Sequence, residues 1–130
     1  MRYLTERFAL GALARGAAIE QFLGPVTVAG RRGIRWVTLT PGAAGIALHD
    51  HVAEDLDGEE TGDLDSLPPM YPDEDRAWGW TLATAQNGSD ALRLAQDMTP
   101  ARPDRWVNVG VAGEDYLDWV QAGRGTSQPG

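Results

Sequence analysis

The 130-residue sequence predicts a single α+β domain in which an antiparallel sheet of about four strands packs against three to four helices. One observation is that short runs of β-branched and aromatic residues recur between turn residues, as is typical of strands. Another is that the remaining segments carry apolar residues at helical spacing. A chain of this length can also bury a core without disulfides, and it contains no cysteine. We expect the domain to span residues 1–123, followed by a disordered tail over residues 124–130.

The N-terminal part is expected to be helical in two pieces within residues 3–23. The second piece, residues 17–23, has three apolar residues on one helical stripe. Gly24 and Pro25 follow it, and such residues typically end a helix. A short edge strand is expected at residues 26–29, and we expect the helices to cover the sheet.

The main strands are expected where β-branched and aromatic residues are dense. Their expected ranges are 34–40, 46–52, 78–84 and 105–109. Two further helices are indicated by apolar stripes, and the first of them follows the capping segment that begins at Asn87. Their expected ranges are 90–98 and 114–121.

Acidic residues are concentrated between Asp50 and Asp75, a segment that holds eleven of the nineteen acids of the chain. No arginine or lysine lies between Arg35 and Arg76. The rest of the chain contains eight acids and eleven arginines and is therefore net positive. This segment thus accounts for the whole net charge of −8. Such a charge disfavours direct binding to nucleic acid and favours a basic protein partner.

Apolar residues are interspersed among these acids, and exposed apolar side chains can anchor a protein interface. These residues are Leu56, Leu64, Leu67, Met70 and Tyr71. We therefore expect a basic protein to bind this segment, the plain alternative being a solubilising loop that binds nothing. The expected partner-binding residues are Glu54, Asp55, Asp57, Glu59, Glu60, Asp63, Asp65 and Tyr71.

His49 and His51 lie two residues apart on an expected strand and therefore project from one face, away from Ile46 and Leu48. Two imidazoles and a carboxylate from the acidic segment can bind zinc or iron, although the spacing specifies no third ligand. A calcium loop of the EF-hand type is disfavoured, because Pro68 occupies the position of the bidentate glutamate. No cofactor is expected.

Signatures of an enzyme are scarce. The chain has no cysteine or lysine, and its three serines suggest no hydrolase triad. We therefore expect a non-enzymatic protein. The alternative is a small-molecule- or metal-binding protein, or a small enzyme, with a site on the sheet lined by tryptophan and histidine. No segment approaches the ~18 uncharged apolar residues of a membrane span, so a cytoplasmic location without a membrane partner is expected.

The segment PDRWVNVGVAGEDYLDWVQAG, residues 103–123, resembles a segment of small, mostly uncharacterised proteins of high-GC bacteria. The order of a helix, a strand hairpin and an acidic loop is similar to that of small immunity proteins of bacterial polymorphic toxin systems. This resemblance implies tight binding to a cognate toxin domain, often a basic nuclease whose groove is blocked by an acidic surface.

Overall fold

The computed structural model describes residues 2–56, 62–70 and 80–124, which form an α+β fold. The sheet is antiparallel throughout, with the strand order β4–β3–β2–β1–β5. The strands are β1 (Ile19–Val28), β2 (Arg31–Gly42), β3 (Gly45–Glu54), β4 (Trp80–Ala85) and β5 (Val107–Asn108). The helices are α1 (Glu6–Ala14), the 3-10 helix η1 (Leu64–Ser66), α2 (Gly88–Met98) and α3 (Ala112–Gln121). The predicted fold class is confirmed, and the sheet has five strands where about four were predicted.

The prediction of a helix over residues 17–23 is wrong, because these residues open β1. Ile19 is buried on one face of the sheet and Phe22 on the other. A short apolar run that is buried on both faces of an inner strand cannot be distinguished from a helix by its spacing. Gly24, with φ of 113°, lies at a shift in the pairing register with β2 and continues the strand instead of ending a helix.

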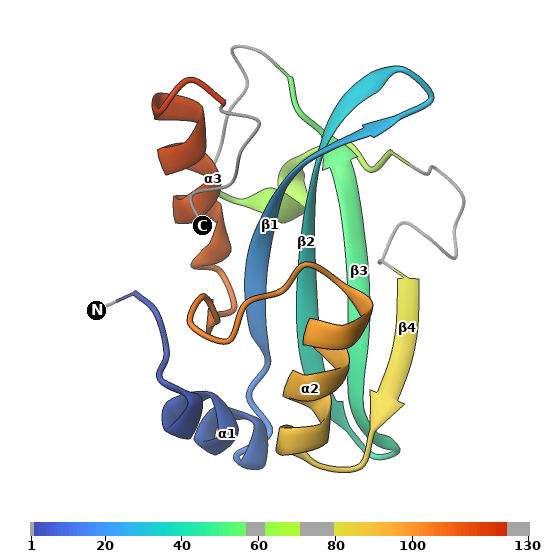
Figure 1. Cartoon of the computed structure of the whole chain (residues 1–130), viewed down its shortest axis with the longest axis vertical. Coiled ribbons are helices and arrows are strands. Elements are labelled where there is room, and N and C mark those ends of the chain that lie inside the picture. The colour runs from blue at the N-terminus through green and yellow to red at the C-terminus, as the bar shows by residue number, and fades with distance from the viewer. Residues whose placement is uncertain (1, 57–61, 71–79, 125–130) are drawn as a thin grey trace.

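Both faces of the sheet are covered, so the sheet is the middle of three layers (Figure 1). On one face α1 and α2 pack over the strands and form the first core. On the other face α3 and residues 62–70 form the second core. The second core comprises Phe22, Ile34, Trp36, Ala53, Leu64, Leu67, Val107, Ala112, Tyr116 and Trp119.

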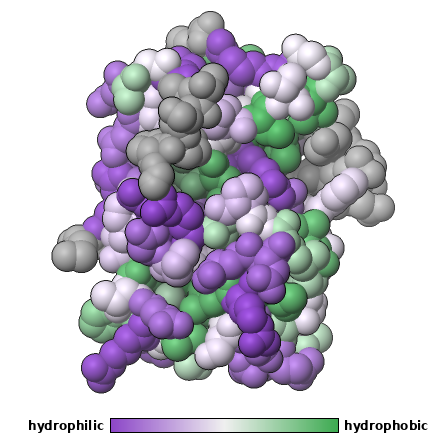
Figure 2. Space-filling view, in the orientation of Figure 1, coloured by the Kyte–Doolittle hydropathy of each residue, from purple (hydrophilic) through white to green (hydrophobic). Residues whose placement is uncertain are grey.

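The first core depends on two capped helices. The Thr5 side chain accepts a hydrogen bond from the Phe8 amide at the start of α1, and Asn87 accepts one from Asp90 at the start of α2. Leu39 and Leu48 are almost completely buried beneath these helices, and each contributes about 2 kcal/mol by burial. On the outer side of this layer, Figure 2 shows hydrophilic residues between separate hydrophobic areas. Within the described residues, no helix is long and apolar enough to cross a membrane.

Residues 62–70, which we name the strap, close the second core on the far side from α2. Leu64, Leu67 and Met70 are each at most 6 % exposed. The end of the strap pairs with the end of β3: the Glu54 amide donates to the Pro68 carbonyl at 2.8 Å. The acidic residues of the strap therefore point outward from a segment that its own apolar residues fix to the sheet.

Candidate functional site

A cleft of about 160 Å³ opens on the second-core side of the sheet, where β1, β2, the strap and the start of α3 meet. Glu20 of β1 and Trp36 of β2 come from the sheet, while Asp63 and Asp65 come from the strap. The other lining residues are Gly62, Leu64, Val109, Gly110 and Gly113. The cleft therefore combines an apolar wall with three carboxylates from two separate elements.

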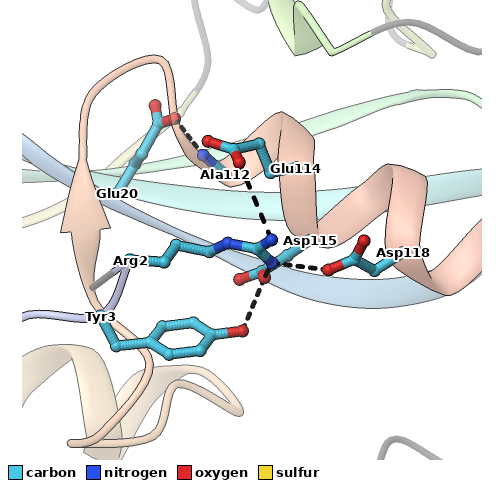
Figure 3. Close-up of polar contacts among 7 residues, drawn as sticks. All are labelled: Arg2, Tyr3, Glu20, Ala112, Glu114, Asp115 and Asp118. Atoms are coloured by element: carbon cyan, nitrogen blue, oxygen red, sulfur yellow. Dashed lines mark hydrogen bonds and ion pairs between the residues drawn. The ribbon is translucent and has the colours of Figure 1, made fainter.

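Glu20 is the buried member of these carboxylates, with 7 % of its surface exposed. Its Oε2 accepts hydrogen bonds from the amides of Gly110 at 2.9 Å and of Ala112 at 3.0 Å. Glu20, which lies on β1, thus supplies the side-chain cap of α3. The N-cap residue Val111 makes no capping hydrogen bond with its own side chain. Figure 3 shows the Oε2 side of the carboxylate facing the start of the helix and the other oxygen facing away.

No arginine of the described residues forms an ion pair with Glu20, and its Oε1 accepts no hydrogen bond within that part of the chain. Burial raises the pKa of Glu20, and the charges of Asp65 and Asp63 raise it further. The two amide bonds lower the pKa in part. The direction of the pKa shift therefore follows from burial of the Glu20 carboxylate, which caps α3 through the two amides.

Two glycines give the cleft its shape. Gly110 has φ of 96°, a conformation that favours glycine, and this turn presents its amide to Glu20. Gly113, in the first turn of α3, lies so close to the strap that a Cβ there would overlap the carbonyl of Gly62. The strap is therefore fixed directly against the N-terminus of α3, which sets the position of Asp63 and Asp65.

One expectation about the apolar residues of the acidic segment is wrong. Leu64, Leu67 and Met70 were expected to anchor a partner, but they are buried in the protein itself. Asp63 and Asp65 are exposed, and the Asp63 carboxylate accepts a hydrogen bond from the Asp65 amide at 3.2 Å. The alternation of buried apolar and exposed acidic residues thus presents charge to the solvent without presenting an apolar surface.

Asp55 differs from the other predicted partner-binding acids, because its side chain is completely buried. The Tyr116 hydroxyl donates to its Oδ1 at 2.8 Å, and the Nε of Arg124 donates to its Oδ2 at 2.9 Å. The Nε of Arg32 lies 3.3 Å from Oδ2. Burial, followed by the bond to Asp55, raises the pKa of Tyr116 to about 12, so the phenol remains a donor. Asp55 therefore joins β3 to α3 and is not presented to a partner.

Arg124 was predicted to begin a disordered tail, but its side chain binds the buried Asp55. Its amide also donates to the Trp119 carbonyl at 3.0 Å. Residues 125–130 lie outside the described part of the chain.

The acids that are separated from arginines in the sequence are close to arginines in the fold. Glu54 pairs with Arg31, and Asp50 accepts from Arg35 at 2.7 Å. These pairs follow from the register of β2 and β3, which brings residues 31–35 beside residues 50–54. Glu54 is therefore already neutralised in part, whereas Glu20 in the cleft is not.

Asp57, Glu59, Glu60 and Tyr71, which were also predicted to bind the partner, lie outside the described residues.

His49 and His51 lie on the same face of β3 as predicted, but that face carries the second core instead of solvent. The His51 ring stacks on Trp36 with centroids 5.0 Å apart, and its Nε2 lies 3.0 Å from the Thr38 hydroxyl. Burial, with a further contribution from His49, lowers the pKa of His51 to about 4. The two imidazole centroids are 6.3 Å apart with perpendicular planes. Among the residues whose positions are described, no three His, Cys, Asp or Glu side chains are grouped as metal ligands.

Two acids of α3, Asp115 and Asp118, are held by the N-terminal segment. Arg2 donates to Asp115 at 2.5 Å and to Asp118 at 2.7 Å, and the Tyr3 hydroxyl donates to Asp115 at 2.6 Å (Figure 3). These acids are therefore neutralised within the protein, and Arg2 is directed toward them and not toward Glu20.

Sequence reasoning did not identify Glu20 or Trp36 as site residues. Glu20 was assigned to a helix, where its direction relative to the sheet could not be inferred. The alternation of residues 19–22, taken as a strand, places Glu20 and Phe22 on one face and would have revealed a carboxylate beside the second core.

Comparisons with models of protein families, with curated proteins and with solved structures found no match.

Proposed function

We propose that this protein is a non-enzymatic inhibitor that binds a basic protein partner through the strap and the cleft beside it. The observation that carries the proposal is that the strap holds exposed carboxylates at the rim of a cleft whose wall contains Glu20, a carboxylate that pairs with no arginine of the described residues. Basic side chains are the groups that such a surface attracts and retains. The resemblance to immunity proteins extends the proposal to a basic toxin domain as the partner.

The fold supports a preformed binding surface. The strap is fixed by its buried leucines and by the contact between Gly62 and Gly113, so Asp63 and Asp65 lose little freedom when a partner binds. Glu54, Asp50 and Asp115 pair with arginines of the same chain and lie away from the cleft. The expected contact is therefore electrostatic and localised at the cleft.

The test compares two variants with the same net charge. Asp63→Asn with Asp65→Asn removes two acids at the cleft, whereas Asp97→Asn with Asp104→Asn removes two exposed acids elsewhere. Isothermal titration with a hexa-arginine peptide at 50 mM and 500 mM salt measures both. We expect about tenfold weaker binding for the first variant, which is about 1.4 kcal/mol, and nearly unchanged binding for the second. Binding of the wild-type chain should weaken strongly with salt.

Equal losses in both variants would show that only the net charge matters and would overturn the proposal. If both variants bind like the wild type, the cleft plays no part and the proposal also fails.

A second function, binding of a small molecule by a site lined with tryptophan and histidine, is favoured by one observation. Trp36 lines the cleft and stacks on His51, beside a carboxylate with a raised pKa. The size of the cleft argues against it, because about 160 Å³ is below the ~300–1,000 Å³ of typical small-molecule pockets. The space suits a single side chain better than a metabolite.

A further inference from the structure

We propose that Asn87, at the start of α2, is a site of spontaneous covalent modification in which its side-chain amide becomes a carboxylate. The backbone nitrogen of Gly88 attacks the side-chain carbonyl carbon of Asn87 and closes a cyclic imide. A C–N bond to Gly88 forms, the C–N bond of the carboxamide breaks, and the Gly88 proton leaves with the ammonia. Water then opens the imide to aspartate or isoaspartate. The reaction requires only water and involves neither the strap nor the cleft.

The reacting groups of this site lie together at the surface. Asn87 is followed by glycine, whose backbone nitrogen is the least shielded because glycine carries no Cβ. Gly88 is the first residue of α2, where an amide has no acceptor within the helix. Asn87 is itself exposed, so water reaches the imide. The fold therefore leaves the nucleophile and its target accessible to each other and to solvent.

Two separate features of the fold favour this pair of residues. Oδ1 of Asn87 accepts a hydrogen bond from the amide of Asp90 at 2.9 Å and so caps α2. A Cβ on Gly88 would lie 3.0 Å from Cδ2 of Leu10, which is closer than ordinary van der Waals contact. Capping thus favours asparagine at the first position, and the packing of α1 against the start of α2 favours glycine at the second.

The cap of α2 also sets the rate of the reaction. Nδ2 of Asn87 donates to Oδ2 of Asp90 at 3.2 Å, so Asp90 holds both polar atoms of the carboxamide. Ring closure breaks these bonds, because Nδ2 leaves and the carbonyl carbon joins Gly88. We therefore expect the reaction to occur when the first turn of α2 opens locally, and a weaker cap should accelerate it.

The other asparagine of the chain, Asn108, provides an internal control. It is also exposed, but it lies in β5, paired with Ile19, and it is followed by Val109. The β-branched side chain of valine shields the backbone nitrogen that would attack. Asn108 should therefore stay unchanged while Asn87 reacts.

The two products affect α2 differently. Aspartate caps a helix as well as asparagine does, and its charge is favourable at a helix N-terminus. Isoaspartate lengthens the main chain by one carbon and displaces the side chain that caps Asp90. We expect the isoaspartate form to lose this cap and to loosen the contact between α2 and Leu10 of α1.

The test follows both asparagines in the full chain during incubation at neutral pH in water enriched in oxygen-18. Trypsin cleaves after arginine, so digestion in ordinary water releases residues 77–93 and 106–124 as peptides with one asparagine each. Mass spectrometry measures the conversion, and the heavy oxygen marks products that formed before digestion. We expect the Asn87 peptide to convert at least tenfold faster than the Asn108 peptide. Unfolding in urea should accelerate conversion of Asn87 further, because it removes the cap.

Asp90→Ala tests the role of the cap, because it removes the acceptor of Nδ2 and leaves the backbone donor to Oδ1. We expect about fivefold faster conversion, the change in the open population that loss of a capping interaction typically causes. The control is Asp97→Ala, which removes an exposed acid from the same helix and should leave the rate unchanged.

Equal conversion of Asn87 and Asn108 in the folded chain would overturn the proposal. Equal rates in Asp90→Ala and Asp97→Ala, or in the folded and the urea-unfolded chain, would overturn the role of the cap. The comparison of the two asparagines uses only the wild-type chain, so it is decisive even where Asp90→Ala does not fold.

Discussion

Two buried carboxylates on the same side of the sheet, Asp55 and Glu20, have opposite surroundings. Asp55 is 3 % exposed and is bound by two arginines and a tyrosine. Glu20 is 7 % exposed and is bound by two backbone amides alone among the described residues. Burial is therefore similar, while the supply of positive charge is not. Among the described residues, Asp55 therefore joins β3 to α3 through charge pairs, whereas Glu20 caps α3 through backbone amides without an ion pair.

The largest expected effect is at Asp55. Asp55→Asn removes the charge that holds Arg32 and Arg124, and breaking a buried pair by removing one partner is strongly destabilising. We expect a loss of about 3 kcal/mol in the free energy of unfolding, measured by urea denaturation at pH 7. The control is Asp104→Asn, whose pair with Arg102 is exposed and should contribute less than about 1 kcal/mol. Similar values for the two variants would contradict the assignment of Asp55 as an anchor.

An intermediate effect is expected at Gly113. In Gly113→Ala the new Cβ overlaps the Gly62 carbonyl, which is backbone and cannot move away cheaply. We expect a loss of about 1–3 kcal/mol, the usual range for overpacking, together with a displaced strap and weaker binding at the cleft.

Gly11→Ala provides the matched control for this substitution in a helix. Its Cβ meets only the flexible end of Arg15, so we expect a gain of about 0.5–1 kcal/mol from higher helix propensity. If Gly113→Ala were also stabilising, the strap would not be fixed by α3 in the way described.

The smallest expected effect on stability is at Glu20. Glu20→Gln keeps an acceptor for Gly110 and Ala112, so we expect a change below about 1 kcal/mol at pH 7. The pKa of Glu20 is raised in the folded state, so its contribution to stability is full below the pKa of the unfolded chain and is lost as pH rises through the folded pKa. The variant should therefore be less stable relative to the wild type at pH 4 than at pH 7.

Urea denaturation at both pH values measures this difference in stability. His51 also makes stability depend on pH, but it does so equally in the wild type and the variant, so its effect cancels in the difference. A loss at pH 7 as large as that of Asp55→Asn would remove the contrast between the two carboxylates. A relative stability that does not depend on pH would contradict the raised pKa.

Much of the fold could be predicted from the sequence where local signals agree with tertiary packing. The dense β-branched residues of β2 and the cap at Asn87 identify their elements without further information. The start of β1 could not be identified, because burial on both faces gives it the apolar spacing of a helix. The strands with a clear alternation and the helices with a clear apolar stripe were predicted to within a few residues. β5 is shorter than expected.

The candidate site was predictable only in part. The concentration of acids singled out the segment that contains the strap, but the burial of its leucines depends on the second core, which no local pattern reveals. Asp55 was grouped with the surface acids because its partners Tyr116 and Arg124 are 61 and 69 residues away in the sequence. Glu20 was missed for a related reason, since its amide donors lie 90 and 92 residues further along the chain.

The position of α3 in the chain has a consequence for the order of folding. The first core is formed by residues up to Trp106, whereas the second core needs α3 and the anchor that Arg124 makes with Asp55. During synthesis the apolar side chains of Phe22, Ile34 and Trp36 are therefore complete long before the helix that covers them. Until α3 docks, the strap alone covers this face of the sheet, and the apolar surface that α3 will cover leaves the nascent protein exposed to aggregation.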